Sequence, residues 1–240
     1  MNYSLSEIPN SGNHLTVFMD IMIKGEELGR IHIGLYRNVF PAGVENFVSI
    51  IEGKTCKVID MGDGAFKYKK CIKRTYEGCK FFNLSHNNYI VTGDIYNNNG
   101  SSAGTIYYDQ PIPPDFGDSY HLHNAKGLIS LVPFRDETTG DIYYDSTFMI
   151  TLDNPEPNNI VAELDNDQIV IGKIYSGIGV IDKINQLIRP FAGRKYPNIT
   201  ISKTGIERRN GFFSRKNEIE TNNNKSINSI NINITPKQQT

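Results

Sequence analysis

The sequence predicts a mainly β protein, in which about seven short strands form a closed or nearly closed antiparallel barrel capped by two α-helices. Short apolar segments with strand-like patterns are spread from Val17 to Ser202. Only two segments space their apolar residues as a helix does. The connections are long and rich in Gly, Asn, Asp and Pro, and such loops usually carry the binding surface of a β scaffold.

The first two strands are predicted to form a hairpin. Apolar residues alternate in the first strand, at Val17, Met19, Ile21 and Ile23. Residues 24–27 (Lys-Gly-Glu-Glu) supply a turn, and the alternation continues at Ile31, Ile33 and Leu35.

The two predicted helices follow from spacing and end signals. Pro41 stands at a plausible first position, Gly53 closes the segment, and between them apolar residues recur at Val44, Phe47, Val48 and Ile51. The second helix is indicated by Val180, Ile181, Ile184, Leu187 and Ile188.

The remaining strands and the domain limits come from shorter signals. Strands are expected at Tyr89–Thr92, Leu128–Val132, Thr147–Thr151, Gln168–Ile174 and Ile199–Ser202. Residues 54–77 are basic and irregular, which predicts a surface loop. We expect a polar N-terminal arm (1–14), one domain (15–209) and an Asn-rich tail (210–240). The tail is either a disordered segment or carries a short strand at Ser229–Thr235 that docks on this molecule or on a neighbour.

Composition limits the function classes. With Lys+Arg 25 and Asp+Glu 26, the net charge of −1 argues against a nucleic-acid partner, because phosphate neutralisation needs surplus cations. No run of 18 apolar residues exists, so a membrane-spanning helix is not expected. The N-terminus lacks the apolar stretch of a secretion signal, so a cytoplasmic or particle-associated protein is expected. The three cysteines are then predicted to be reduced thiols, and they contain no zinc-type C-x-x-C pair.

The order of several motifs resembles the cyclophilins, a family of peptidyl-prolyl cis/trans isomerases. The opening strand Val17–Ile21, Gly29-Arg30 and the helix with Pro41 and Glu45-Asn46-Phe47 match its first third. Further matches are Gly93-Asp94, Gly127–Leu131, Phe148, Leu164-Asp165 and Gly172. The resemblance covers Leu15 to Glu207 and implies an eight-stranded antiparallel barrel with two helices. Compared with the family pattern, extra residues stand at 54–75, 117–126, 135–145 and 153–162.

The implied reaction makes clear chemical demands. Rotation about a peptide bond has a barrier of roughly 18–20 kcal/mol. In the twisted state the prolyl nitrogen becomes a better hydrogen-bond acceptor, so an arginine that donates to it there lowers the barrier. An apolar pocket must also hold the proline ring, and polar groups must fix the flanking backbone.

Carried over position by position, the resemblance implies that almost all of these groups are replaced. The position of the catalytic arginine is Asn83, and the pocket and substrate-binding positions are Asn88, Tyr89, Val91, Val132, Pro133, Thr147, Met149, Glu163, Leu164 and Gln168. Only Leu164 is the family residue. The leading interpretation is therefore a cyclophilin-fold protein that is catalytically silent or very weak and acts as a protein-binding or structural module.

Two alternatives stay open. The first is an active isomerase with an altered groove, in which Asn83 or a relocated Arg135 or Arg74 replaces the missing donor. The second is an assembly component that forms a homo-oligomer, or attaches to a larger particle, through its insertions or its tail.

Three weaker signals have two interpretations each. His121-x-His123, with Asp115 and Asp118 nearby, is either a zinc site or an ordinary polar loop; we favour the loop and expect no metal or cofactor. Tyr89 and Met149 either form a new binding surface or plug the former pocket. The basic residues 67–74 either contact an acidic partner or are solvated.

The absence of tryptophan from the chain generates a ligand prediction. In the resembled family, a tryptophan often precedes the Leu-Asp pair and donates its indole N–H to cyclosporin-type ligands. Glu163 occupies that position here and has no such donor. We expect weak or no cyclosporin binding in a fluorescence or calorimetric titration, and a submicromolar dissociation constant would refute this prediction.

Overall fold

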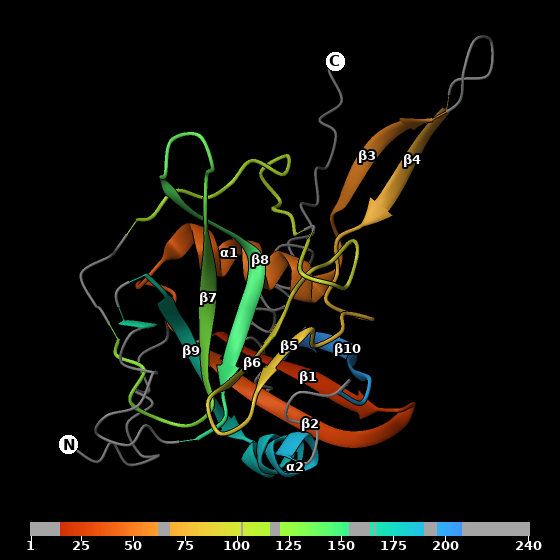
Figure 1. Ribbon diagram of the computed structural model, residues 1–240. Helices are drawn as coiled ribbons and strands as arrows, with labels where there is room; N and C mark the ends of the chain where they lie inside the picture. The colour runs from red at the N-terminus through yellow and green to blue at the C-terminus, as the bar shows by residue number, and fades with distance from the viewer. Residues whose placement is uncertain are drawn as a thin grey trace, which may run out of the picture. The chain divides into compact units, whose positions relative to one another are not determined.

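The computed structural model describes residues 15–61, 68–101, 103–115, 121–153, 164–165, 167–189 and 196–207 (Figure 1). The predicted N-terminal arm (1–14) and tail (210–240) lie outside the described residues. The elements are β1 (Leu15–Ile23), β2 (Glu26–Leu35), α1 (Pro41–Glu52), β3 (Cys56–Met61), β4 (Tyr68–Lys73), β5 (Asn83–Ser85), β6 (Tyr89–Thr92), β7 (Leu128–Arg135), β8 (Ile142–Thr151), β9 (Ile169–Ser176), α2 (Ile178–Ile188) and β10 (Ile199–Ile206).

Eight strands form one antiparallel sheet in the order β10-β1-β2-β9-β7-β8-β6-β5. The segment before β5 closes this sheet onto its other end: Gly78 N–H donates to Ile201 O (2.7 Å) and Phe81 N–H to Ile199 O (3.0 Å). These bonds give edge strand β10 a second partner besides β1. The predicted mainly β fold, with eight antiparallel strands and two helices, is confirmed.

Apolar packing inside the curled sheet forms the core. The rings of Phe47, Tyr76 and Phe148 contact one another with centroids 5.1–5.2 Å apart. Helix α1 places Phe47 there, beginning with Pro41 as expected and ending at Gly53, whose φ of 60° is the left-handed conformation that glycine adopts easily. Helix α2 buries the predicted apolar face at Val180, Ile181, Ile184 and Ile188. Among the described residues, no helix is long and apolar enough to cross a membrane.

Some strands are longer than the sequence patterns predicted. Strands β7 and β8 extend to Arg135 and from Ile142, so part of the predicted insertion 135–145 is a hairpin extension. Pro133 lies within β7, next to a register shift between Leu131 and Pro133. A bulge of this kind tolerates a residue without an N–H, which explains why the strand continues past a proline.

The predicted surface loop at 54–77 is wrong at Cys56–Met61 and Tyr68–Lys73, which are strands. Strands β3 and β4 form a separate two-stranded ribbon, which projects from the barrel in Figure 1. Because the ribbon is not backed by the core, neither of its faces needs the apolar alternation by which strands are predicted.

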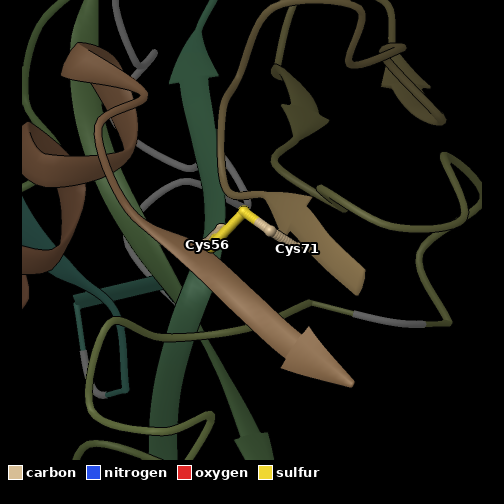
Figure 2. The surroundings of a disulfide bond; sticks show 2 residues. All are labelled: Cys56 and Cys71. Atoms are coloured by element: carbon tan, nitrogen blue, oxygen red, sulfur yellow. A yellow bond between two sulfur atoms is a disulfide. The ribbon is translucent and has the colours of Figure 1, made fainter. Parts of the chain in front are cut away.

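The prediction of three reduced thiols is wrong for two of them. Cys56 and Cys71 form a disulfide between neighbouring strands of the ribbon (Figure 2). The ribbon register pairs Cys56 with Lys73 and Cys71 with Val58, which makes the cysteines diagonal neighbours with Cα atoms 5.5 Å apart. A linear spacing of 15 residues cannot reveal this proximity unless the hairpin is known. Cys79 is a free thiol as predicted, and burial raises its pKa to about 12.

The loop after β6 is organised by one buried carboxylate. Asp94 is 1% exposed and accepts five backbone hydrogen bonds, from the N–H groups of Tyr96, Asn97, Asn99, Gly100 and Ser101. Burial alone would raise the pKa of Asp94, but these N–H donors outweigh it and lower the pKa below the ordinary value. The charged carboxylate therefore fixes the path of residues 95–101.

The disulfide predicts a specific thiol count. Native protein should show no reactive thiol, denatured protein one (Cys79), and denatured reduced protein three in a colorimetric thiol titration. Reduction should also speed tryptic cleavage at Lys69 and Lys70, because an isolated two-stranded ribbon is marginally stable and closing a 15-residue loop contributes about 3 kcal/mol. The melting of the barrel should change little. Three thiols in denatured, unreduced protein would contradict the disulfide.

Replacement of Asp94 predicts a loss of stability. Asp94→Ala removes the side-chain acceptor of the Tyr96, Asn97, Asn99 and Gly100 N–H groups, whereas the Ser101 N–H keeps Asn99 Oδ1. We expect a decrease of about 2–4 kcal/mol in the free energy of unfolding, measured by urea denaturation. Since the folded pKa is depressed, the wild-type carboxylate contributes stability above its unfolded pKa of ~3.9 and loses it as pH falls through the folded pKa. Asp136→Ala, at an exposed turn, is the matched control and should cost less.

Candidate ligand groove

The predicted groove positions are gathered by the pairing of four strands. Asn83 on β5 pairs with Val91 on β6, Val91 pairs with Met149 on β8, and Met149 pairs with Ser130 on β7. Directly paired residues project to the same side of a sheet. The neighbouring row, Leu84, Ile90, Ile150 and Ile129, is buried in the core. The four groove residues therefore lie on the opposite face, away from that core.

Apolar side chains fill the middle of this row. Val91 is 6% exposed and Met149 is 1% exposed, although neither faces the barrel core. Their Cβ atoms stand roughly 4.5–5.5 Å apart as a directly opposed pair. Tyr89, two residues before Val91, is half-buried and pairs with Thr151. The positions that should offer a proline pocket and a polar anchor thus hold a closely packed apolar pair.

The end of the row that should hold the arginine carries no charge. Asn83 is exposed and has only a neutral amide. Asn88 lies in the turn between β5 and β6. Its side-chain amide donates to Ser85 Oγ (2.9 Å), and its backbone carbonyl accepts a hydrogen bond from the N–H of Leu152 (2.9 Å). Asn88 therefore contributes hydrogen bonds to this turn.

Both candidate replacement arginines are engaged elsewhere. Arg74 is 5% exposed and donates from Nε and Nη2 to Asp109 Oδ1 at 3.4 and 3.3 Å. Arg135 donates to Asp167 Oδ2 at 2.9 Å. It stands five residues beyond Ser130 along β7, roughly 17 Å away at the rise of a β-strand. Neither guanidinium contacts Asn83.

The described positions predicted for the other side of the groove are half-buried. Val132 and Pro133 are half-buried on β7, and Pro133 has no N–H to offer a substrate backbone. Thr147 is half-buried, and its N–H donates to Asp145 Oδ1 at 2.6 Å. Leu164 and Gln168 are both half-buried and are joined by a backbone hydrogen bond of 3.0 Å, whereas Glu163 lies outside the described residues.

The histidine pair is not arranged as a metal site. His123 is 2% exposed; its Nδ1 lies 2.7 Å from Asp165 Oδ1 and its Nε2 lies 2.8 Å from Ser130 Oγ. His121 instead packs on the ring of Tyr36, with centroids 4.5 Å apart. No group of three or more His, Cys, Asp or Glu side chains is placed for a metal ion within the described ranges. Asp118 lies outside them.

His123 has a structural role that the sequence pattern did not reveal. Burial lowers its pKa, and the opposing effect of Asp165 does not restore the ordinary value. A neutral ring donates from Nδ1 to Asp165 and accepts from the Ser130 hydroxyl. Through these two bonds it fastens Leu164-Asp165 to β7 at the groove. The fold brings the three residues together from two loops and β7, which a linear sequence does not reveal.

Comparisons with known proteins agree with this architecture. The family model for the cyclophilin type peptidyl-prolyl cis-trans isomerase matches residues 18–206. A structural PPIase-like protein of Acanthamoeba polyphaga mimivirus is 56% identical over 225 residues, which are 94% of this chain and 96% of the relative. A peptidyl-prolyl cis-trans isomerase of Arabidopsis thaliana is 25% identical over 189 residues, 79% of this chain and 74% of the relative.

A solved structure has the same fold. The crystal structure of the mimivirus cyclophilin matches with a TM-score of 0.70 and 55% identity, over 86% of this chain and 96% of that chain. The eight-stranded sheet, the ordered motifs and the family match over most of the chain lead to one assignment: this chain belongs to the cyclophilin-type peptidyl-prolyl cis-trans isomerase family.

Proposed function

We propose that this protein is a cyclophilin-fold module whose groove is catalytically silent or very weak, and that it works as a protein-binding or structural component. The observation that carries this proposal is the row Asn83–Val91–Met149, in which the arginine position is neutral and the middle is filled by buried apolar side chains.

Without a cation at position 83, the groove stabilises the twisted transition state less. A donor lowers the isomerisation barrier only if it stabilises the twisted amide more than the planar one. A charge-assisted hydrogen bond is roughly twice as strong as a neutral one, so an asparagine amide is a weak substitute for a guanidinium. Asn83 is also shorter than arginine, which places its amide farther from a bound prolyl nitrogen.

The packed pair Val91–Met149 disfavours the binding of a prolyl substrate. A prolyl substrate must be held with its ring in an apolar pocket and its backbone fixed by polar groups. Met149 is almost fully buried, and Val91 cannot donate a hydrogen bond. This packing supports the interpretation that Met149 plugs the former pocket, and disfavours a new open binding surface there.

A role in assembly is supported by two separate observations. The mimivirus relative, 56% identical, is named a structural PPIase-like protein. The Cys56–Cys71 disulfide is a feature of proteins that work in oxidising surroundings, such as the outside of a particle or cell. Together they favour a particle-associated protein over one that stays in a reducing cytoplasm.

An altered but active isomerase is the second candidate. It would need a cation near Asn83, and the two arginines considered are bound to Asp109 and Asp167. Arg135 is exposed, so its ion pair contributes little and can break easily. Arg74 is buried, and its release would leave a buried charge unpaired.

An isomerase assay on an X-Pro peptide tests the proposal. We expect wild-type protein to show no acceleration above the uncatalysed rate. Asn83→Arg alone should remain close to that rate, because Met149 and Val91 still occupy the groove. Adding Val91→Gln and Met149→Phe, which restores the family residues, should raise the rate measurably.

An isomerase activity that depends on Arg135 would contradict the proposal. A wild-type rate enhancement that disappears in Arg135→Ala, with an unchanged circular dichroism spectrum, would support the altered isomerase. Arg135→Lys then serves as the matched variant, since it keeps the charge but loses the planar fork of donors.

A further inference from the structure

A proline-rich segment outside the groove occupies residues 110–114, with the sequence Gln-Pro-Ile-Pro-Pro. Proline fixes φ at about −65° and has no N–H, and it also moves the residue before it into the β or polyproline II region. Each of the five residues is either a proline or directly precedes one. The local sequence therefore favours a polyproline II helix over an α-helix.

The pattern of exposure in this segment agrees with the three-residue period of polyproline II. Ile112 is 3% exposed, whereas Gln110, Pro111, Pro113 and Pro114 are exposed. In a strand with a period of two, residues 110 and 114 would share the buried side of Ile112. With a period of three, residues 110 and 113 form one ridge, 111 and 114 form a second, and Ile112 stands on the third. The two ridges that carry the prolines therefore face outward.

Backbone hydrogen bonds fix the segment to the barrel. Ile112 N–H donates to Tyr144 O (2.9 Å), and Ile112 O accepts from Tyr144 N–H (2.8 Å). Thr105 Oγ1 donates to Gln110 O (2.7 Å), and Gln110 N–H donates to Tyr107 O (3.0 Å). The backbone is thus held at two points, and a partner can meet the exposed side chains without first ordering the segment.

The two outward ridges have the chemistry of a ligand for a known type of groove. SH3 domains bind P-x-x-P segments in a groove lined by aromatic side chains. Pro111 and Pro114 have this spacing and lie about 9 Å apart along a polyproline II helix. A groove that covers a proline leaves no N–H unsatisfied, because proline has none. A segment that is already rigid also loses little conformational entropy on binding.

We propose that residues 110–114 are a docking segment for a partner protein with an SH3-type groove. The outward position of Pro111 and Pro114 and the anchoring of Ile112 to the barrel carry this proposal. The inference rests on the proposed protein-binding role and names a class of partner for it. The contact uses a surface separate from the groove row Asn83–Val91–Met149.

The charge next to the segment restricts the partner. Asp115 directly follows the last proline and is exposed. Before the segment, the carboxylate of Asp109 already pairs with Lys57 (2.9 Å) and Arg74 (3.3 Å). Asp115 is therefore the exposed charge that adjoins the prolines along the chain. Charge complementarity favours a groove with a basic residue at the rim near Pro114.

Biolayer interferometry with immobilised full-length protein tests the proposal against a panel of purified SH3 domains that includes members with basic groove rims. We expect the members with basic rims to bind reversibly with micromolar dissociation constants. A free P-x-x-P peptide, which occupies the same groove, should displace them. Pro111→Ala combined with Pro114→Ala should weaken binding by about ten-fold or more, because both rings are removed from the groove.

Matched variants separate recognition of the prolines from a general effect on the loop. Pro113→Ala makes the same chemical change on the neighbouring ridge, outside the Pro111–Pro114 pair, and should weaken binding less. Asp115→Asn should lower the association rate and its dependence on salt. All four residues are exposed, so the melting temperature of each variant should change little.

Three outcomes would overturn the proposal: no binding by any SH3 domain of the panel, binding that the Pro111→Ala, Pro114→Ala variant retains, or binding that the free peptide does not displace. Binding by purified WW domains but by no SH3 domain would also overturn the assignment to a P-x-x-P groove. The isomerase assay reports on the groove row alone, so a silent groove and a failed docking segment can be told apart.

Discussion

The backbone register of β5, β6, β8 and β7 is the constraint on which the remaining features depend. It assigns alternate residues to opposite faces, so that Ile90 and Ile150 pack into the core while Val91 and Met149 meet on the groove face. A slip of one residue would exchange the two sets and place groove residues in the core. The register therefore decides which residues contribute to the core and which line the groove face.

Buried and half-buried polar side chains hold the loops around the sheet in place. Asp94 holds residues 95–101, Asp109 joins the ribbon to the Tyr108 loop, and His123 ties Leu164-Asp165 to β7. Each group is satisfied by several partners, as buried polar atoms must be. The Asp94 and Asp109 clamps draw on residues outside the groove row, whereas the His123 clamp reaches Ser130 within it.

Sequence reasoning succeeded where burial leaves a pattern. The alternation at Val17–Ile23 and the spacing at Val44–Ile51 predicted β1 and α1 because one face of each meets the core. It failed at the β3–β4 ribbon, which has no core face, and therefore also at the Cys56–Cys71 disulfide. The predicted groove positions came only from the resemblance; their burial, and the hydrogen bond between His123 and Ser130, could be read only from the fold.

Left-handed backbone occurs at a few non-glycine positions among the described residues, namely Lys24, Asn87, Asn98, Tyr108 and Asp109. Tyr108 and Asp109 are consecutive in the chain, and the Tyr108 side chain is 92% exposed. Strain of this kind persists when the surrounding structure enforces it and when it serves a function. At Tyr108 and Asp109 the surrounding structure includes the ion pairs of the Asp109 carboxylate with Lys57 (2.9 Å) and Arg74 (3.3 Å), which fasten the loop in this conformation.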